Sequence, residues 1–117
     1  MNSIAAIIGP IYQKLLQICE KRQISLNLDL ERPSLKIRQE QLLRDFLQDS
    51  LSCSIKCCKK HNKITISQSI DEQRKIRFSI KSDGDIFGDD VKAKLTEHGY
   101  HVRSRFGYGN TISVELN

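Results

Sequence analysis

The spacing of apolar residues switches repeatedly between a helical and a strand period along the 117 residues, which limits the chain to folds that mix both elements. The first apolar stripe recurs at steps of three and four residues: Ile4, Ile8, Ile11, Leu15 and Ile18. It predicts an amphipathic helix that runs to about Arg22, with Pro10 either kinking it or marking its start. Strict alternation of apolar and polar residues then predicts a strand with one buried face. Its apolar members are Ile24, Leu26, Leu28 and Leu30.

The middle of the chain predicts a short strand, a long helix and a hairpin. Pro33 ends the first strand, and Leu35 with Ile37 indicates a short second one. From Gln39 the period is helical again, with a broad stripe of apolar and small residues. Residues 64–70 and 76–80 alternate on either side of a polar loop at 71–74, which is typical of a hairpin.

The last third predicts one more helix and a second pair of strands. Residues 88–98 form the helix, because acidic residues near its start suit the helix dipole and Gly99 marks its end. Strands at 102–106 and 112–116 flank the turn 107–110. Six strands and three helices, each apolar on one side, predict an α+β fold: a two-layer sandwich whose mixed, mostly antiparallel sheet is covered on one face by the helices. We expect a single domain over residues 1–117.

Three segments, taken in order, resemble the catalytic and ATP-binding domain of sensor histidine kinases, which belongs to the GHKL superfamily with the Bergerat fold. IRQEQLLRDFLQDSLSCSIK is similar to the family's Asn-containing helix, and HNKITIS to the strand that follows it. EHGYHVRSRFGYGNTISVEL resembles the closing hairpin. The last match is the most specific, because a Gly after the helix and a G-x-G-x-T turn fall at the family's spacing.

The resemblance identifies seven positions with the family's nucleotide site: Asp49, Cys53, Ser82, Gly84, Gly107, Gly109 and Thr111. Working members carry Asn residues on the central helix that hold magnesium, and the matching positions here are Asp49 and Cys53. A thiol is a poor ligand for this hard cation, which prefers oxygen. The family's adenine-reading segment is D-x-G-x-G, but here it reads SDGDI, with Ser82 in place of the carboxylate and Ile86 in place of a Gly.

Two larger parts of the family's machinery are also expected to be missing. The family's long glycine-rich lid, which closes over the phosphates, has no room between Ile86 and Val91. The family's phosphoacceptor helix pair lies outside the matched segments, and none of the three histidines stands in its acceptor motif. We therefore expect vestigial site positions, no catalytic residue, and no bound ATP or magnesium.

These departures predict a degenerate histidine-kinase ATPase-like domain, a pseudokinase that acts as a protein-interaction or regulatory module in two-component-type signalling. The expected partner is a kinase, a response regulator or a second copy, and the first helix is the candidate contact. The enzymatic alternative is the ATP-binding domain of a sensor histidine kinase with an atypical site, built on Asp49 and the turn 107–111. A small α+β domain that alternates by chance remains the unrelated alternative.

Two further groups of residues suggest other ligands. Asp49, Cys53 and Cys57 lie four residues apart on the central helix, and His61 continues this spacing if the helix persists, so a zinc site is an alternative to burial of the thiols. Cys58 is expected to face the core. Basic residues alternate on two strands and predict a basic open sheet face that could bind nucleic acid: Lys75, Arg77, Lys81, His101, Arg103 and Arg105. Because Phe78 and Phe106 are expected to face inward, this face has few aromatic platforms for base stacking, and we do not expect nucleic-acid binding.

Composition sets the expected compartment. The apolar start at 4–11 is too short to span a bilayer, and four cysteines without a secretory signal favour reduced thiols. We expect a cytoplasmic protein without membrane insertion. The formal net charge of +5 permits an acidic partner without requiring one.

Overall fold

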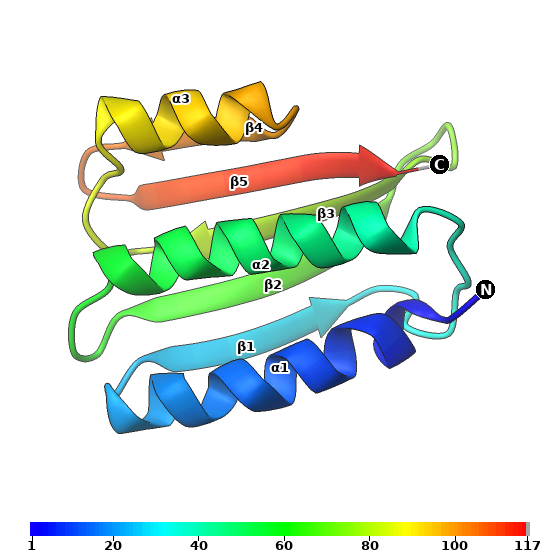
Figure 1. The fold of residues 1–117 in the computed structure, drawn as a ribbon, viewed down its shortest axis with the longest axis horizontal. Coiled ribbons are helices and arrows are strands. Elements are labelled where there is room, and N and C mark those ends of the chain that lie inside the picture. The colour runs from blue at the N-terminus through cyan, green and yellow to red at the C-terminus, as the bar shows by residue number, and fades with distance from the viewer. Residues whose placement is uncertain (117) are drawn as a thin grey trace.

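A computed structural model describes residues 1–116 and contains three helices and five strands in these residues (Figure 1). The elements follow one another as α1 (Ile4–Lys21), β1 (Ser25–Leu30), α2 (Glu40–Cys57), β2 (Lys63–Ile70), β3 (Ile76–Ser82), α3 (Asp89–Glu97), β4 (His101–Arg105) and β5 (Gly109–Leu116).

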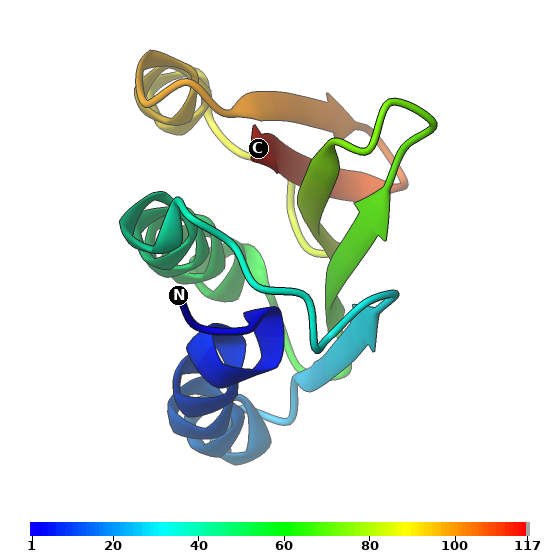
Figure 2. The ribbon, with the colours of Figure 1, turned by 90° about the vertical axis from the view of Figure 1, so that its right-hand side faces the viewer.

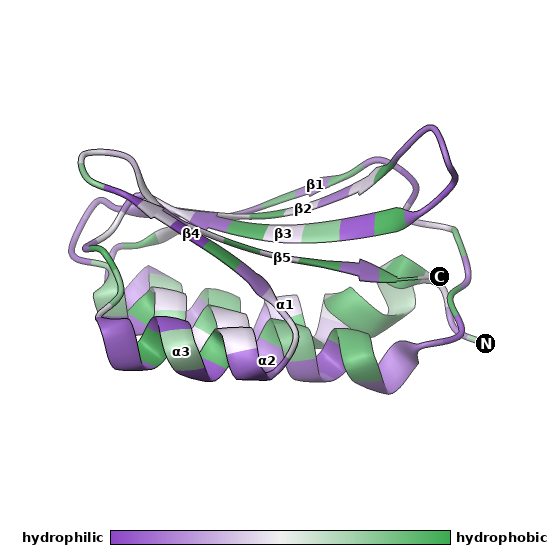
Figure 3. Cartoon of the chain, turned by 90° about the horizontal axis from the view of Figure 1, so that it is seen from above, coloured by the Kyte–Doolittle hydropathy of each residue, from purple (hydrophilic) through white to green (hydrophobic). Residues whose placement is uncertain are grey.

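The elements form two layers, a sheet and a layer of helices on one of its faces (Figures 2 and 3). The strand order is β1-β2-β3-β5-β4. β1 and β2 are parallel because α2 connects them, whereas every other neighbouring pair is antiparallel. α1 packs on β1, α2 on β3 and β5, and α3 on β4. The expected α+β sandwich, with a mixed and mostly antiparallel sheet covered on one face, is confirmed.

The core lies between the two layers and is built by the predicted periodicities. Alternate residues of β2, β3 and β5 point toward the helices, and the fully buried ones include Ile64, Ile66, Phe78, Ile80 and Ile112. α2 contributes Leu43, Phe46, Leu47 and Leu51, all without exposed surface. Cys58 is also buried, as its position in the pattern predicted.

The first helix begins earlier than Pro10. The Ser3 side chain caps it by accepting a hydrogen bond from the backbone N–H of Ala6 over 3.1 Å, and Pro10 lies inside the helix. The predicted apolar stripe is buried at its N-terminal end and exposed at its C-terminal end. Ile4 and Ile8 reach the core, but Ile18 is 42% exposed at the other end of the stripe.

The predicted strand at Leu35 and Ile37 is wrong, so the sheet of the described residues has five strands rather than six. This segment instead pairs with the start of α1 through an isolated bridge between Ser3 and Lys36. The backbone N–H of Ile4 donates to the carbonyl of Leu35 over 2.8 Å. The physical reason is that the first N–H groups of a helix lack intrahelical acceptors, and this extended segment supplies them.

The predicted inward orientation of Phe106 is also wrong, whereas that of Phe78 is confirmed. Arg105 pairs with Gly109, so β4 ends one residue earlier than expected, β5 begins three residues earlier, and Phe106 lies in the turn. Its side chain is 88% exposed, and Tyr108 in the same turn is 72% exposed. No helix within residues 1–116 combines the length and apolar character needed to cross a bilayer.

Candidate functional site

The seven positions singled out from the sequence lie on three parts of the fold. Asp49 and Cys53 are on α2, Ser82 ends β3 and Gly84 follows it, and the other three lie in or next to the β4–β5 turn. Gly84 lies against the C-terminal end of α2, and Gly109 lies against Ser82.

Asp49 joins α2 to the segment that links α3 with β4. Its Oδ2 accepts a hydrogen bond from the Tyr100 hydroxyl over 3.1 Å and lies 3.1 Å from Nδ1 of His98. The Tyr100 ring packs edge-on against Phe46, with ring centroids 5.1 Å apart. Burial, together with the neighbouring Asp49 carboxylate, raises the pKa of Tyr100, so its hydroxyl stays protonated and keeps donating. The Asp49 carboxylate therefore acts as a tether between two helices in this structure.

Cys53 and Cys57 follow Asp49 on α2 and are both half-buried. Burial raises the pKa of each thiol, so both are protonated at neutral pH. α2 ends at Cys57, and His61 adopts a positive φ of 74° in the turn beyond it, so His61 does not continue the helical spacing of the zinc alternative. No group of three or more Cys, His, Asp or Glu side chains in residues 1–116 is placed to hold a metal ion.

Gly84 brings the 83–88 connection against the C-terminal end of α2. A Cβ at this position would lie 2.5 Å from the carbonyl oxygen of Cys57, a distance that real Cβ atoms essentially never show. The same carbonyl accepts a hydrogen bond from the backbone N–H of Asp85 over 2.9 Å. The glycine thus permits a backbone-to-backbone contact that closes this end of the layer.

Ser82, which the resemblance matches to the family's adenine-binding carboxylate, is 4% exposed and faces the helices. Its hydroxyl has no hydrogen-bond partner, and the same holds for the buried hydroxyls of Ser50 and Ser54 on α2. A hydroxyl in this environment is tolerated at modest cost, whereas an unpaired carboxylate is not.

Asn110 is the structural residue of this region that the sequence patterns did not single out. Its side chain is 2% exposed and forms three hydrogen bonds. Oδ1 accepts from the Phe87 backbone N–H over 3.0 Å and from the Ser104 hydroxyl over 2.7 Å, while Nδ2 donates to the Asp85 carbonyl over 2.8 Å. A polar residue at an inward position of an alternating strand was the available signal, because buried amides are almost always hydrogen-bonded.

The three residues of the G-x-G-x-T turn have separate roles. Gly107 has a φ of 83° and open space around it, so only the backbone conformation calls for glycine. Gly109 has a φ of 95° and lies so close to the Ser82 carbonyl that any Cβ would clash with it. Thr111 is half-buried and alternates with the inward-facing Asn110 and Ile112, so it belongs to the opposite face of the sheet from Asp49.

The open face of the sheet is polar and largely basic. Thr111 of β5 is flanked by Lys81 of β3 and by Arg103 of β4 in the strand register. Arg77 forms an ion pair with Glu115 across β3 and β5 at 2.5 Å. At the turn, the Arg105 guanidinium lies 4.6 Å from the centre of the exposed Tyr108 ring. The predicted basic face is present, and the turn at one end of it carries two exposed aromatic rings, Phe106 and Tyr108.

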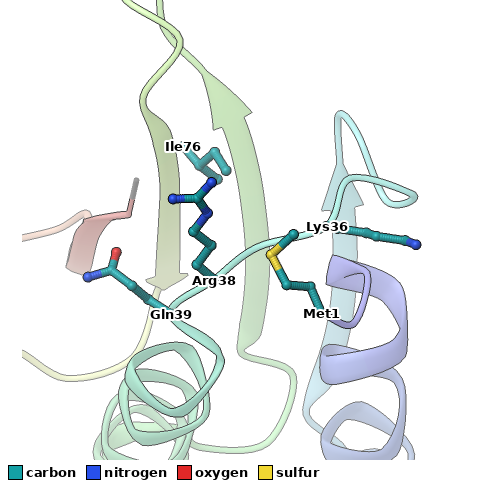
Figure 4. Close-up of a pocket in the computed structure, with 5 residues that line it drawn as sticks. All are labelled: Met1, Lys36, Arg38, Gln39 and Ile76. Carbon is teal, nitrogen blue, oxygen red and sulfur yellow. The ribbon is translucent and has the colours of Figure 1, made fainter.

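A small pocket of about 400 Å³ lies at the far end of β3 from Ser82 (Figure 4). It is lined by Met1, Lys36, Arg38, Gln39 and Ile76. In Figure 4 the Arg38 side chain extends toward Ile76, whereas Lys36 points away from the other lining residues. None of the seven sequence-derived positions lines this pocket.

Solved histidine kinase structures share this fold. No family model and no curated protein matches the sequence. The nucleotide-free catalytic domain of histidine kinase ThkA superimposes with a TM-score of 0.77 at 16% identity, covering 98% of this chain and 94% of that one. Acinetobacter baumannii histidine kinase AdeS gives a TM-score of 0.74 at 14% identity, covering 99% of this chain and 65% of that one.

A third structure is that of ThkA in complex with the response regulator protein TrrA, with a TM-score of 0.75 and 18% identity. The match covers 99% of this chain and 40% of the ThkA chain. The chain therefore has the size of an isolated catalytic domain and spans less than half of that longer kinase. These superpositions establish that the fold is that of histidine kinase catalytic domains, and at identities this low they establish the fold alone.

Proposed function

We propose that this domain is a histidine-kinase-like module that does not bind ATP and that acts through contact with a protein partner in two-component signalling. The observation that carries the proposal is the closed end of β3. Ser82 is 4% exposed, and Gly84 holds the following segment against the Cys57 carbonyl. A nucleotide base needs a concave surface with accessible polar groups at this point.

The residues at the magnesium positions also fit the cofactor poorly. The Asp49 carboxylate is already engaged by Tyr100 and lies beside His98. The Cys53 thiol is kept protonated by burial, and a neutral thiol offers no useful ligand to a cation that prefers oxygen. These donors support the proposal that neither magnesium nor ATP is the ligand of this domain.

The short connection between β3 and α3 points in the same direction. Only residues 83–88 separate the two elements, and Asn110 binds both the Phe87 N–H and the Asp85 carbonyl within this segment. A segment so short and so firmly attached to β5 supports a domain without a phosphate-covering lid. We infer no phosphoryl transfer by this chain.

The partner is proposed from the fold alone. The match to ThkA in its complex with TrrA makes a kinase or a response regulator a reasonable class of partner for a domain of this shape. The cytoplasm is the compartment that this proposal implies.

Isothermal titration of the full chain with MgATP, and separately with ATP and EDTA, tests the nucleotide part. The expected result is no saturable binding up to about 1 mM nucleotide. A dissociation constant of about 1 mM corresponds to a binding free energy of only about 4 kcal/mol, so any weaker association is not a specific site. A histidine kinase catalytic domain titrated in the same buffers serves as the positive control. Magnesium-dependent binding with a micromolar dissociation constant would show that the atypical ATP site is functional.

Nucleic-acid binding is a second candidate, because the turn at one end of the basic face exposes the Phe106 and Tyr108 rings, with the Arg105 guanidinium over Tyr108. Gel retardation of a labelled single-stranded oligonucleotide tests it. Retention at low salt that weakens steeply as salt rises, and that is lost in Phe106→Ala, would favour this function. No retardation at low salt would exclude it.

A further inference from the structure

α1 and α2 lie side by side on the same face of the sheet and run in the same direction (Figure 1). Between them is a groove of about 700 Å³ that no strand residue lines. The groove is lined by Ala6, Ile7, Pro10, Ile11, Lys14, Leu15 and Ile18 of α1 and by Gln41, Arg44, Gln48, Ser52, Ile55 and Lys56 of α2. The positions that the nucleotide-site resemblance identified take no part in it.

Hydrogen bonds hold the two helices together at both ends of the groove. At the N-terminal end, Asn2 donates to the Glu40 carboxylate through its backbone N–H and its side chain. At the C-terminal end, the Arg22 guanidinium donates to the carbonyls of Ile55 and Cys58, each over 2.8 Å. The groove is therefore preformed, and a ligand that enters it does not have to order the helices first.

The floor of the groove is apolar because the predicted stripe of α1 does not end at the core. Ile11 and Leu15 are only partly buried, and Ile18 is 42% exposed. The lining of α1 runs from Ala6 to Ile18, a length of about 18 Å at 1.5 Å per residue. An amphipathic helix of three to four turns has a matching length, and it fills such grooves with side chains at helical spacing.

The rim of the groove carries charge of one sign. Lys14, Arg44 and Lys56 line it, and no Asp or Glu is among the lining residues. Arg44 shares its charge with Glu40 at 3.4 Å. A complementary occupant therefore carries acidic residues on both sides of its apolar stripe.

This charge pattern distinguishes between the possible occupants. A second copy of α1 would bring its own Lys14 and Lys21 against a basic rim, which disfavours symmetric self-association through the groove. A fatty acid carries a single carboxylate, which can pair with only one of the three basic side chains of the rim. An acidic amphipathic helix offers carboxylates to all three and apolar side chains to the floor.

We propose that the α1–α2 groove is the docking site for an amphipathic helix of a partner protein, whose apolar stripe lies on Ile11, Leu15 and Ile18 and whose flanking Asp and Glu side chains pair with Lys14, Arg44 and Lys56. This inference rests on the proposed function, because it specifies the class of partner for that interaction module.

Fluorescence anisotropy of designed helical peptides against the full chain tests the proposal. One panel of 18-residue peptides carries a Leu stripe flanked by Glu, with the stripe shifted by one residue at a time. A second panel has the same stripes flanked by Lys. At least one acidic peptide is expected to bind with a dissociation constant of about 10–100 μM, at least about tenfold tighter than its Lys counterpart.

Charge reversals on the protein locate the binding. Lys14→Glu combined with Lys56→Glu is expected to raise the dissociation constant of the acidic peptide about tenfold. The matched control, Lys81→Glu with Arg103→Glu on the open sheet face, is expected to change binding less than about twofold. Ile18→Glu, at an exposed position, should abolish binding without unfolding the domain, which circular dichroism verifies.

Several outcomes would overturn the proposal. These are no binding by any register of the acidic panel, equal binding of both panels, or equal weakening by the sheet-face control. Saturable binding of a fluorescent fatty acid that Ile18→Glu abolishes, with no peptide binding, would assign the groove to a lipid instead. The peptide titrations contain no nucleotide, so their failure leaves the ATP test unaffected.

Discussion

Gly84 packs against Cys57 so closely that a Cβ on the glycine would lie 2.5 Å from the carbonyl oxygen of the cysteine. This contact attaches the segment after β3 to the C-terminal end of α2, and it also closes the end of the fold where the resemblance suggests a nucleotide base. A backbone contact of this kind cannot relax by rotating a side chain, so it is sensitive to a single methyl group.

The first prediction follows directly. Gly84→Ala should lower the free energy of unfolding by about 1–3 kcal/mol, because the methyl group forces the 83–88 segment away from α2. Urea unfolding followed by circular dichroism measures this. Gly9→Ala is the matched control: the space around Gly9 is open and it lies inside α1, so the same substitution should raise stability by up to about 1 kcal/mol. Equal effects in the two variants would contradict the structure.

The second prediction concerns Asn110. Asn110→Ala removes three hydrogen bonds and leaves the Phe87 N–H, the Ser104 hydroxyl and the Asp85 carbonyl without their partner. A loss of about 2–4 kcal/mol is expected, since unsatisfied buried groups cost more than the bonds contribute.

Hydrogen exchange gives the specific readout for Asn110. The Phe87 amide should lose its protection from exchange in Asn110→Ala. The protection of the α1 amides should fall only by as much as the global free energy of unfolding falls. Thr111→Ala, the neighbouring position on the other face, should cost less than about 1 kcal/mol. Unchanged exchange at Phe87 would mean that Asn110 does not hold the segment.

The sequence was sufficient for the fold class, three helices and five strands, because each of these elements has its own hydrophobic period, but it also predicted a strand at Leu35 and Ile37 that does not form. Phe78 shows where this works: alternation placed it inward, and it is fully buried. Phe106 shows where it fails. Its pattern is the same, but the pairing of Arg105 with Gly109 ends the strand before it, and pairing register is set by the partner strand rather than by local sequence.

The site was less accessible to sequence reasoning for a related reason. The Asp49–Tyr100 hydrogen bond joins residues 51 positions apart, and the contact of Gly84 with Cys57 depends on how α2 lies across the sheet. Family resemblance identified which positions to inspect. It could not say which internal contacts these positions make, because the contacts involve residues that are not among the seven, such as His98 and Asn110.

The third prediction is a loss of stability at alkaline pH. Burial, with Asp83 as a smaller contribution, raises the pKa of Cys58 to about 11, against 9.0 for an exposed thiol. Between these values the unfolded chain releases the proton and the native state keeps it. The contribution of Cys58 to the free energy of unfolding is therefore fully present below about pH 9 and is lost as the pH rises toward 11.

Urea unfolding at pH 8 and pH 10.5 measures this dependence. Cys58→Ala should lower stability at both values but reduce the difference between them. Some difference should persist, because burial also raises the pKa of Cys19, Cys53 and Cys57. A wild-type protein equally stable at both pH values would contradict the burial of these thiols.

The last prediction asks whether position 82 can accommodate the carboxylate that the resemblance places there. Ser82→Asp places a carboxylate at a position that is 4% exposed, where even the serine hydroxyl lacks a partner. Burying an unpaired charge should destabilise the domain by at least about 3 kcal/mol at pH 7, and its pKa should rise. Because the native state would then hold a proton that the unfolded chain releases, the variant should recover stability as the pH falls from 7 toward 4 relative to wild type.

Ser82→Ala is the matched control and should be neutral or slightly stabilising, because it removes an unpaired hydroxyl. A Ser82→Asp variant that stays as stable as wild type at pH 7 and gains adenosine binding would mean that this end of the sheet opens readily, and the proposal of a nucleotide-free module would then fail.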